Sequence, residues 1–315
     1  MDISVVVVTY NPNYQKLLTT LKSVICQKDV EFEVIIADDG SKNFDKDIIK
    51  DFFSECNFYN YRLVLNEKNQ GTMKNALSGW TAAKGKYIKQ LSPGDYLYSN
   101  NTLYCMYNYI KKTGATLIFG TEASYSIENN KIELIDYSNP VDIRPYIEAD
   151  SDAIINKYVV ERQFANGMTF LVQRSKLLEY ANLLNGKVKY GEDFTYLLMI
   201  AGEEPVAFLN TYVIWYEYGS GISTTTNSIW FERLDKDKKA CYSEVSRLNK
   251  KLKNLKWKYY DYENENFFLR YLWKIYRRIR YSKTVRRQNK KNEQFTKNLP
   301  EPDVKHLLKL IDEFG

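Results

Sequence analysis

Three short acidic motifs contain side chains that could do chemistry. Adjacent carboxylates stand at Asp38 and Asp39, a second acidic pair is Glu192 and Asp193, and Asp95 follows a Pro-Gly turn. Carboxylates can accept hydrogen bonds from a base or a ribose, ligate a divalent cation, or take a proton from a hydroxyl group. These residue types therefore suggest nucleotide binding combined with general-base chemistry.

Histidine and cysteine contribute little to this chemistry. His306 is the single histidine among 315 residues and lies near the C-terminus, so neither a Ser-His-Asp triad nor a histidine metal site is expected. The four cysteines are widely separated without a CxxC pair, which argues against zinc ribbons and indicates reduced thiols. Catalysis must then rest on carboxylates, hydroxyls, backbone dipoles or a metal held by oxygen.

Each nucleotide-binding candidate also has a simpler structural interpretation. Asp38 and Asp39 could accept from a base or ribose, or they could form an Asx turn that caps the following helix. The triplet Thr9, Tyr10 and Asn11 could hold a base by stacking and hydrogen bonding, or it could simply end a strand in an Asn-Pro turn.

The same holds for the other two acidic motifs. Asp95 could ligate Mg²⁺, which needs only one or two protein carboxylates when phosphate oxygens are present, or it could merely close its turn. Glu192 and Asp193 precede a helix, where acidic side chains are favoured as caps by the helix dipole. The functional alternative is a general base that deprotonates an acceptor hydroxyl.

The elements that must position these motifs follow an alternating pattern over the first 120 residues. Apolar, β-branched runs predict strands, and helical periodicity lies between them; the predicted strands are 3–8, 32–37, 61–65, 86–91 and 115–119. Such alternation indicates βαβ units and a parallel sheet, and ligands bind beyond the carboxyl ends of its strands. The polar motifs follow those ends, so an α/β fold would gather them at one edge.

The remaining chain divides at about residue 225. Between 121 and 225 the pattern predicts a β-ribbon at 118–135 and a helix at 194–201, whereas residues after 228 are predicted to be helical. The expected helices are 230–255, 264–287 and 304–314. We therefore expect a domain over 1–225, with halves 1–120 and 121–225, and a helical C-terminal region over 226–315.

The net charge of +6 is unevenly distributed. Residues 240–300 carry 17 basic and 5 acidic side chains, so the rest of the chain is acidic by six charges. An apolar stripe and a basic face alternate at helical spacing between 268 and 281; the stripe is Phe268, Leu272, Ile275 and Ile279, and its neighbours include Arg270, Trp273, Lys274, Arg277 and Arg278. This pattern is typical of a helix on an anionic membrane surface, or of one that packs its stripe on the catalytic domain.

Other partners and locations are less consistent with the sequence. Nothing resembles a base-reading module, so nucleic acid is not expected to bind the basic segment. The sequence contains no run of 18 apolar residues, so no transmembrane helix is expected. The acidic Asp2 does not fit the start of a signal peptide. A cytoplasmic protein, peripheral at the inner face of the cell membrane, is the expectation.

The order of the motifs resembles the family 2 glycosyltransferases with the GT-A fold. The segments VVVVTYNPN, ADDGS, NQGTMKNALSGWTAAKGKYIKQLSPGDYL and GEDF occur in the family's order within about the first 220 residues. The resemblance implies a Rossmann-like, mostly parallel central sheet flanked by helices. It also implies transfer of a sugar from a nucleotide-sugar to an acceptor hydroxyl.

The resemblance assigns roles to the motif residues. Asp193 matches the catalytic base, beside Glu192, and Asp95 matches the last carboxylate of the family's metal-binding D-x-D element. The nucleotide is expected at Thr9, Tyr10, Asn11, Asp38, Asp39, Asn69, Gly71 and Asn75. Ser220, Gly221 and Ser223 resemble the loop that covers the diphosphate.

One motif departs from the family pattern. Where the family has Asp-x-Asp-Asp, this chain has Ser92-Pro93-Gly94-Asp95, so a single carboxylate remains to hold Mg²⁺ or Mn²⁺. A weak metal site is expected, and metal-independent transfer stays open. A nucleotidyltransferase and a non-catalytic sugar-nucleotide-binding module are the alternatives.

The resemblance also predicts the reaction in more detail. We expect an inverting hexosyl- or N-acetylhexosaminyltransferase that uses a UDP-sugar. The acceptor is expected to be a saccharide, lipid-linked, in the synthesis of a bacterial capsule, lipopolysaccharide or cell-wall polymer. An oligomer is compatible with the sequence.

Overall fold

The computed structural model describes most of the chain. The described residues are 1–128, 131–135, 140, 142–160, 163–219, 228–253, 299–312 and the five positions Phe268, Tyr271, Leu272, Ile275 and Ile279.

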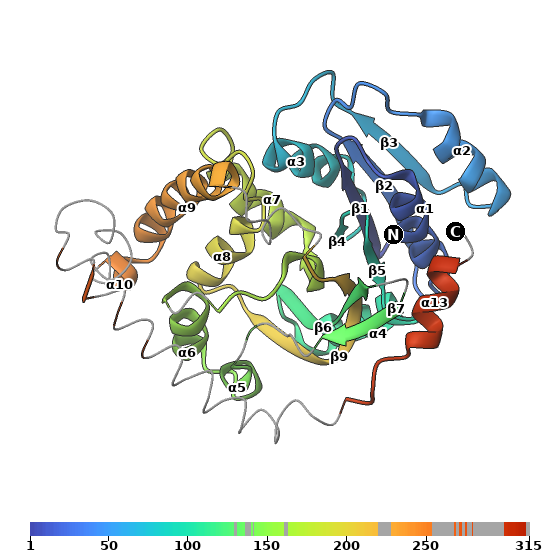
Figure 1. Ribbon diagram of the computed structural model, residues 1–315. Helices are drawn as coiled ribbons and strands as arrows, with labels where there is room; N and C mark the ends of the chain where they lie inside the picture. The colour runs from blue at the N-terminus through green and yellow to red at the C-terminus, as the bar shows by residue number, and fades with distance from the viewer. Residues whose placement is uncertain are drawn as a thin grey trace.

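A nine-stranded sheet forms the centre of the molecule (Figure 1). The strand order is β3-β2-β1-β4-β8-β6-β9-β5, and β7 pairs with β6 off this path. The strands are β1 (Ile3–Thr9), β2 (Phe32–Asp38), β3 (Tyr61–Leu65), β4 (Tyr87–Leu91), β5 (Asp95–Leu97), β6 (Leu117–Glu128), β7 (Lys131–Ile135), β8 (Phe170–Gln173) and β9 (Val206–Glu217). The sheet is therefore continuous through both predicted halves of the catalytic domain.

The first predicted half, residues 1–120, is centred on a parallel sheet. Strand β1 pairs in parallel with β2 and β4, and β2 pairs in parallel with β3. All seven residues of β1 are buried, as expected for an apolar strand covered on both faces. In this register Thr9 lies opposite Asp38, so the ends of the first two strands meet at one edge.

Helices cover both faces of this half. Ile3, Val5 and Val7 of β1 pack in one apolar cluster with α1 (Tyr14–Ile25), α2 (Lys46–Glu55) and α4 (Thr102–Thr113). Val6 and Val8 point the other way, because side chains alternate along a strand, and pack with α3 (Thr72–Ala82).

The second half combines antiparallel pairings and the parallel pair β6–β9 with short helices. Strand β8 pairs antiparallel with both β4 and β6, which attaches this half to the parallel sheet. Its helical elements are α5 (Arg144–Ile147), α6 (Ser151–Ile155), the π-helical turn η1 (Asn156–Val160), the 3-10 turn η2 (Gly167–Thr169), α7 (Arg174–Leu184) and α8 (Phe194–Ala201). Helix α8 is almost entirely buried, so the residues just before it are held against the sheet.

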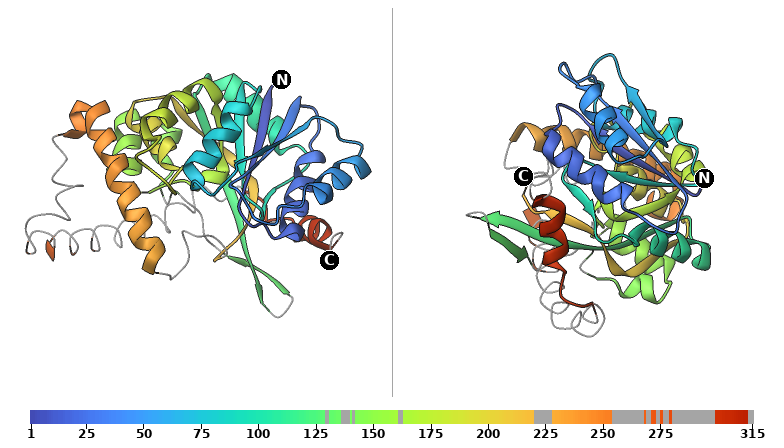
Figure 2. Two further views of the ribbon diagram at one scale, coloured as in Figure 1. Left: turned by 90° about the horizontal axis from the view of Figure 1, so that it is seen from above. Right: turned by 90° about the vertical axis from the view of Figure 1, so that its right-hand side faces the viewer.

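The C-terminal region contacts the catalytic body at two separate places. Helix α9 (Ser228–Leu248) leads into α10 (Lys250–Lys253) and shares the apolar cluster of α3, α7 and α8. Helix α13 (Val304–Asp312) lies on the other side of the molecule (Figures 1 and 2) and buries Leu307 against Tyr125 and Trp215. The described helices before and after residues 254–298 thus both pack on the body.

Most of the predicted elements are confirmed, and the exceptions depend on tertiary pairing. The separately predicted strand at 115–119 and the first strand of the ribbon form one long strand, β6, and β9 is twelve residues long. Strand β5 was not predicted, because it has three residues and exists by pairing with β9. The predicted helix 264–287 falls largely outside the described residues.

Within the described part of the chain, no helix is both long and apolar enough to cross a membrane.

Candidate active site

Asp38 ties together the loops that follow β1 and β2. Its carboxylate accepts hydrogen bonds from the Thr9 hydroxyl (2.9 Å) and from the backbone N–H and hydroxyl of Ser41 (2.7 and 2.6 Å). The Ser41 hydroxyl in turn accepts from the backbone N–H of Asn11 (2.6 Å). Thr9 and Asp38 are buried, whereas the neighbouring Tyr10 is 53% exposed. The predicted nucleotide residues are thus assembled at one edge, where the Tyr10 ring is the accessible surface.

Asp39 connects this edge to the N-terminus of α3. Its two carboxylate oxygens accept the backbone N–H groups of Gln70 (2.9 Å) and Gly71 (2.8 Å), and the side chain is buried. Gly71 has a φ of 94°, and a Cβ there would lie 2.5 Å from the Lys189 carbonyl oxygen. A glycine is therefore required, both by the backbone conformation and by the close approach of the loop before the acidic pair.

The side chain of Asn75 holds the ends of β1 and β2 together. Its amide nitrogen donates to the carbonyl oxygens of Thr9 (3.1 Å) and Ala37 (2.9 Å), while its amide oxygen accepts from Asn66 (3.2 Å). The side chain is buried, so it satisfies strand ends rather than facing a ligand. Asn69 lies on the exposed part of the same loop.

Asp95 closes the turn that replaces the family's D-x-D element. Its Oδ2 accepts the backbone N–H of Ser92 (2.8 Å), and its own N–H donates to the Ser92 carbonyl (2.9 Å). The structural alternative for this residue is thus correct, but the turn uses only one of the two carboxylate oxygens. Burial raises the pKa of Asp95 to about 6.

Asp193 does not cap the helix that it precedes. It occupies the N-cap position of α8, yet its side chain makes no capping hydrogen bond and remains exposed to solvent. Glu192 is less exposed and accepts from the Gln90 amide (3.2 Å) on β4. The capping interpretation of Asp193 is therefore wrong, and its carboxylate is accessible to a substrate.

The acidic pair has a raised affinity for protons. Desolvation by the surrounding protein, and secondly the negative charge of Asp95, raise the pKa of Asp193 to about 6. Desolvation, reinforced by the charge of Asp193, raises the pKa of Glu192 well above its usual value. A carboxylate with a pKa near 6 is a stronger base than an ordinary aspartate and is still ionised at neutral pH.

Gly167 lies directly against the carboxylate of Asp193. A Cβ on Gly167 would overlap all three atoms of that carboxylate group. No local pattern predicts this contact, since the two residues are 26 positions apart.

Lys89 is a further residue that sequence reasoning missed. It is a fully buried lysine in β4 whose ammonium group donates to the carbonyl oxygens of Met168 and Phe170. Burial lowers the pKa of Lys89 to about 7, although the nearby Asp95 opposes this shift. A lysine within the apolar strand YIKQL was the available signal. Its contacts attach the Gly167 segment to the strand that leads to Asp95.

Lys16 brings a cation to the same turn. Its ammonium group pairs with Glu217 at the end of β9 (2.6 Å), and its Cδ would lie 3.6 Å from a Cβ on Gly94. The predicted diphosphate loop begins just beyond Glu217, but Ser220, Gly221 and Ser223 lie outside the described residues. Also outside them are Arg270, Trp273, Lys274, Arg277 and Arg278, the basic and aromatic residues predicted to face a membrane.

The carboxylate oxygens of this site suit a cation that is held mainly by the diphosphate of a bound nucleotide-sugar. Among the residues that the structure describes, no group of three or more acidic, histidine or cysteine side chains could hold a metal ion. Asp95 offers the carboxylate oxygen that its turn does not use. One carboxylate together with diphosphate oxygens suits Mg²⁺ or Mn²⁺, whereas a site without the diphosphate would be weak.

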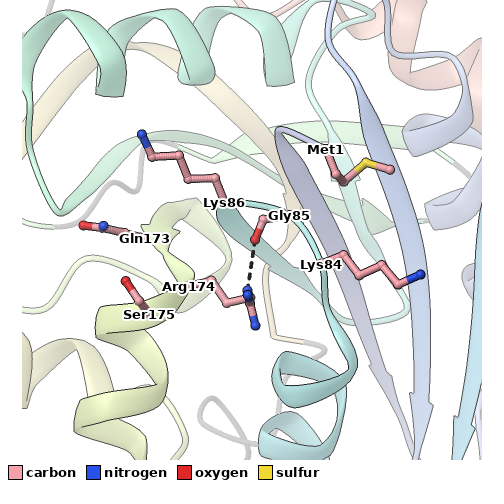
Figure 3. Close-up of a pocket in the computed structure, with 7 residues that line it drawn as sticks. All are labelled: Met1, Lys84, Gly85, Lys86, Gln173, Arg174 and Ser175. Carbon is pink, nitrogen blue, oxygen red and sulfur yellow. Dashed lines mark hydrogen bonds between the residues drawn. The ribbon is translucent and has the colours of Figure 1, made fainter.

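A separate pocket of about 240 Å³ lies at the opposite edge of the sheet (Figure 3). Met1, Gly85 and Arg174 are among its lining residues, and Arg174 donates to the Gly85 carbonyl (3.1 Å). The ammonium groups of Lys84 and Lys86 lie on different sides of this pocket and do not converge (Figure 3). It is unrelated to the motif residues, which follow the other ends of the strands.

The fold and this edge define a GT-A glycosyltransferase, with a nucleotide-binding parallel half and an acidic pair on the adjoining half. The model of glycosyl transferase family 2 matches residues 4–171, and the chain belongs to this family.

Individual relatives agree with this assignment. An uncharacterized glycosyltransferase of Haemophilus influenzae is 25% identical over 198 residues, which cover 62% of this chain and 70% of the relative. Two crystal structures of Staphylococcus aureus TarS 1-349 share the fold. The complex with UDP has a TM-score of 0.53 at 14% identity, covering 87% of this chain and 78% of TarS. The complex with UDP-GlcNAc has a TM-score of 0.55 at 16% identity, covering 84% and 74%.

Proposed function

We propose that this glycosyltransferase transfers a sugar from a UDP-sugar, with inversion, to a hydroxyl group of a saccharide acceptor. The observation that carries the proposal is the Asp193 carboxylate, which is exposed, is not used as a helix cap and has a pKa raised to about 6. A hexose or N-acetylhexosamine is the transferred group.

The donor assignment is supported by the nucleotide edge. The exposed Tyr10 ring offers a stacking surface for a base, beside the loops that Asp38 and Asp39 hold in place. The two TarS structures that share this fold hold UDP and UDP-GlcNAc, which supports UDP as the nucleotide here.

The chemical step is a single displacement. Asp193 removes the proton of the acceptor hydroxyl, and the acceptor oxygen forms a bond to the anomeric carbon from the face opposite the diphosphate. The bond between that carbon and the diphosphate oxygen breaks, and UDP leaves with the electron pair. Glu192, fixed by Gln90, orients the loop that carries the base.

Asp95 would hold Mg²⁺ or Mn²⁺ together with the diphosphate oxygens. When bound, the cation offsets the negative charge that develops on the leaving diphosphate. Because Asp95 is the only protein carboxylate proposed for this role, we expect metal and donor to bind together rather than independently.

We further propose that the acceptor is lipid-linked, an intermediate of a bacterial surface polysaccharide, and that the basic segment contacts the inner face of the cell membrane. Five apolar positions of this segment are exposed rather than packed in a core, namely Phe268, Tyr271, Leu272, Ile275 and Ile279. Exposed apolar side chains among basic ones suit an anionic bilayer surface.

Vesicle binding tests the membrane proposal. The protein should float with vesicles containing phosphatidylglycerol, not with phosphatidylcholine alone, and Leu272→Ser with Ile275→Ser should weaken this binding. Equal flotation of the double variant would contradict the proposal, and retention on duplex DNA instead would favour nucleic acid.

The reaction itself is tested by incubating the protein with a panel of nucleotide-sugars, with and without Mn²⁺. Release of UDP, together with stabilisation by the same UDP-sugar in a thermal-shift assay, is the expected result. In a parallel incubation with nucleoside triphosphates and sugar 1-phosphates, release of pyrophosphate would identify a nucleotidyltransferase instead. Binding without turnover on any saccharide acceptor would indicate a non-catalytic module.

A further inference from the structure

Helix α9 lies against the loop that carries the acidic pair. Five of its residues contact this loop or the helix that follows it, and they recur every three or four residues along one helix face. They are Trp230, Arg233, Asp237, Cys241 and Glu244.

Asp237 makes the central contacts. Its Oδ1 accepts the backbone N–H of Lys189 (3.0 Å), and its Oδ2 accepts those of Tyr190 (2.5 Å) and Gly191 (3.1 Å). The side chain is 3% exposed. Three consecutive N–H groups of an irregular loop thus have one buried carboxylate as their partner, and the next residues along the chain are Glu192 and Asp193.

Contacts on both sides of Asp237 hold the same loop. Tyr190 packs edge-on against Trp230, with ring centroids 5.2 Å apart, and the Arg233 guanidinium lies over both rings. Lys187 pairs with Glu244 (2.6 Å) at the other end of the contact.

Helix α9 is itself fixed to the body, so its contacts can hold the loop in one position. The Tyr242 hydroxyl donates to the Val159 carbonyl (2.9 Å), and the Asn249 amide beyond the helix donates to the Ala201 carbonyl (2.9 Å). Val245 is buried in the main apolar cluster.

The loop also contacts the nucleotide half. The Met73 N–H donates to the Lys189 carbonyl (3.0 Å), so Lys189 joins the start of α3 through its carbonyl and Asp237 through its N–H. Gly71, whose N–H is held by Asp39, lies against the same residue. The loop before the acidic pair is therefore held by both the nucleotide edge and α9.

We infer that Asp237 is a positioning residue, which sets the location of the Asp193 carboxylate by holding the N–H groups of Lys189, Tyr190 and Gly191. This inference rests on the proposed role of Asp193 as general base. It gives helix α9, which follows the family's matched segment, an indirect part in the reaction.

Asp237→Asn tests the inference with the smallest change of shape. An amide can accept through one atom only, so its NH₂ group must face one of the loop N–H groups and release it. Displacement of the base by about 1 Å would lower kcat about 100-fold, while the KM for the donor stays within about threefold. Asp235→Asn is the matched control, because Asp235 lies on the same helix and its carboxylate pairs with Lys238 and Lys239.

A second measurement is hydrogen exchange, and its wild-type part does not depend on the folding of a variant. Hydrogen exchange should show slow exchange for the amides of Lys189, Tyr190 and Gly191, and in Asp237→Asn this protection should be lost at these amides while α8 stays protected. Unprotected wild-type amides would overturn the inference.

The kinetic outcomes are equally decisive. A kcat of Asp237→Asn within about threefold of wild type, or an equal loss in Asp235→Asn, would overturn the positioning role. If the wild-type protein transfers no sugar at all, the proposed function fails first, so the two failures are distinguishable.

Discussion

Gly167 offers a way to displace the Asp193 carboxylate without touching Asp193 itself. A methyl group at position 167 would occupy the volume that this carboxylate fills. Gly167 lies in the 3-10 turn η2 and does not have a positive φ, so the backbone accepts alanine without strain. The Asp193 side chain must therefore rotate away, and it is free to do so because no capping bond holds it.

The size of the effect follows from this geometry. Removal of the overlap requires the carboxylate to move by at least 1 Å, and a displacement of about 1 Å costs about 100-fold in rate, which is about 2.7 kcal/mol. The carboxylate moves into solvent rather than into the core, so the change in the free energy of unfolding should stay below about 1 kcal/mol.

The assay for Gly167→Ala compares kcat, the KM for the donor and Tm. We expect kcat to fall about 100-fold, with the KM changed by less than about threefold and Tm lowered by no more than about 3 °C. Gly114→Ala is the control in which stability should change but activity should not. Gly114 ends α4 with a φ of 66° and has open space around it, so alanine there should lower Tm and leave kcat unchanged. Turnover of Gly167→Ala within threefold of wild type would refute the placement of the base.

Three further predictions follow from the site. Asp39→Asn removes one of two charge-assisted bonds to the Gln70–Gly71 backbone and should weaken UDP binding about 10- to 100-fold by calorimetry; unchanged affinity would exclude this role. Asn75→Ala removes the amide hydrogen bonds to the carbonyls at the ends of β1 and β2, although the Thr9 carbonyl keeps the Asp39 N–H. It should cost about 1–3 kcal/mol in urea unfolding, whereas a loss below about 0.5 kcal/mol would contradict the contacts. The pH profile of kcat should have an acidic limb near pH 6, because the raised pKa of Asp193 keeps the proton on the base to a higher pH than usual. An acidic limb near pH 4 would indicate an unperturbed carboxylate.

Local sequence patterns predict the elements whose own residues are mostly apolar. The sequence predicts the strand Tyr61–Leu65 and the helix Phe194–Ala201 with the observed bounds. A short, mostly apolar stretch indicates the strand, which is half-buried, and apolar residues at helical spacing indicate the helix, which is almost entirely buried. Strand β5 could not be predicted in this way, since its three residues acquire their conformation from pairing with β9.

The motif residues were predicted correctly as members of one edge, but their individual tasks were not evident. Asp38 and Asn75 are predicted to bind the nucleotide, and the structure adds protein partners through which both of them shape the edge. A residue type at a strand end indicates a site, whereas its partners depend on loops that come together only in the fold.

The supporting residues had the weakest sequence signals. Lys89, Gly167 and Asp237 reach the site from a strand, a 3-10 turn and a C-terminal helix, and nothing in their local sequence connects them to the acidic pair. Helix α9 was predicted as a helix, but its loop-facing side is recognisable only when Lys189, Tyr190 and Gly191 are placed beside it.

The most direct test of the account compares wild-type protein with Asp193→Asn, measuring UDP release at saturating donor and UDP affinity by calorimetry. Asparagine keeps the size of the side chain but cannot accept the proton, so kcat should fall by at least about 1,000-fold while the Kd for UDP stays within about twofold. An Asp193→Asn variant that turns over at near wild-type rate would contradict the claim that this carboxylate is the general base.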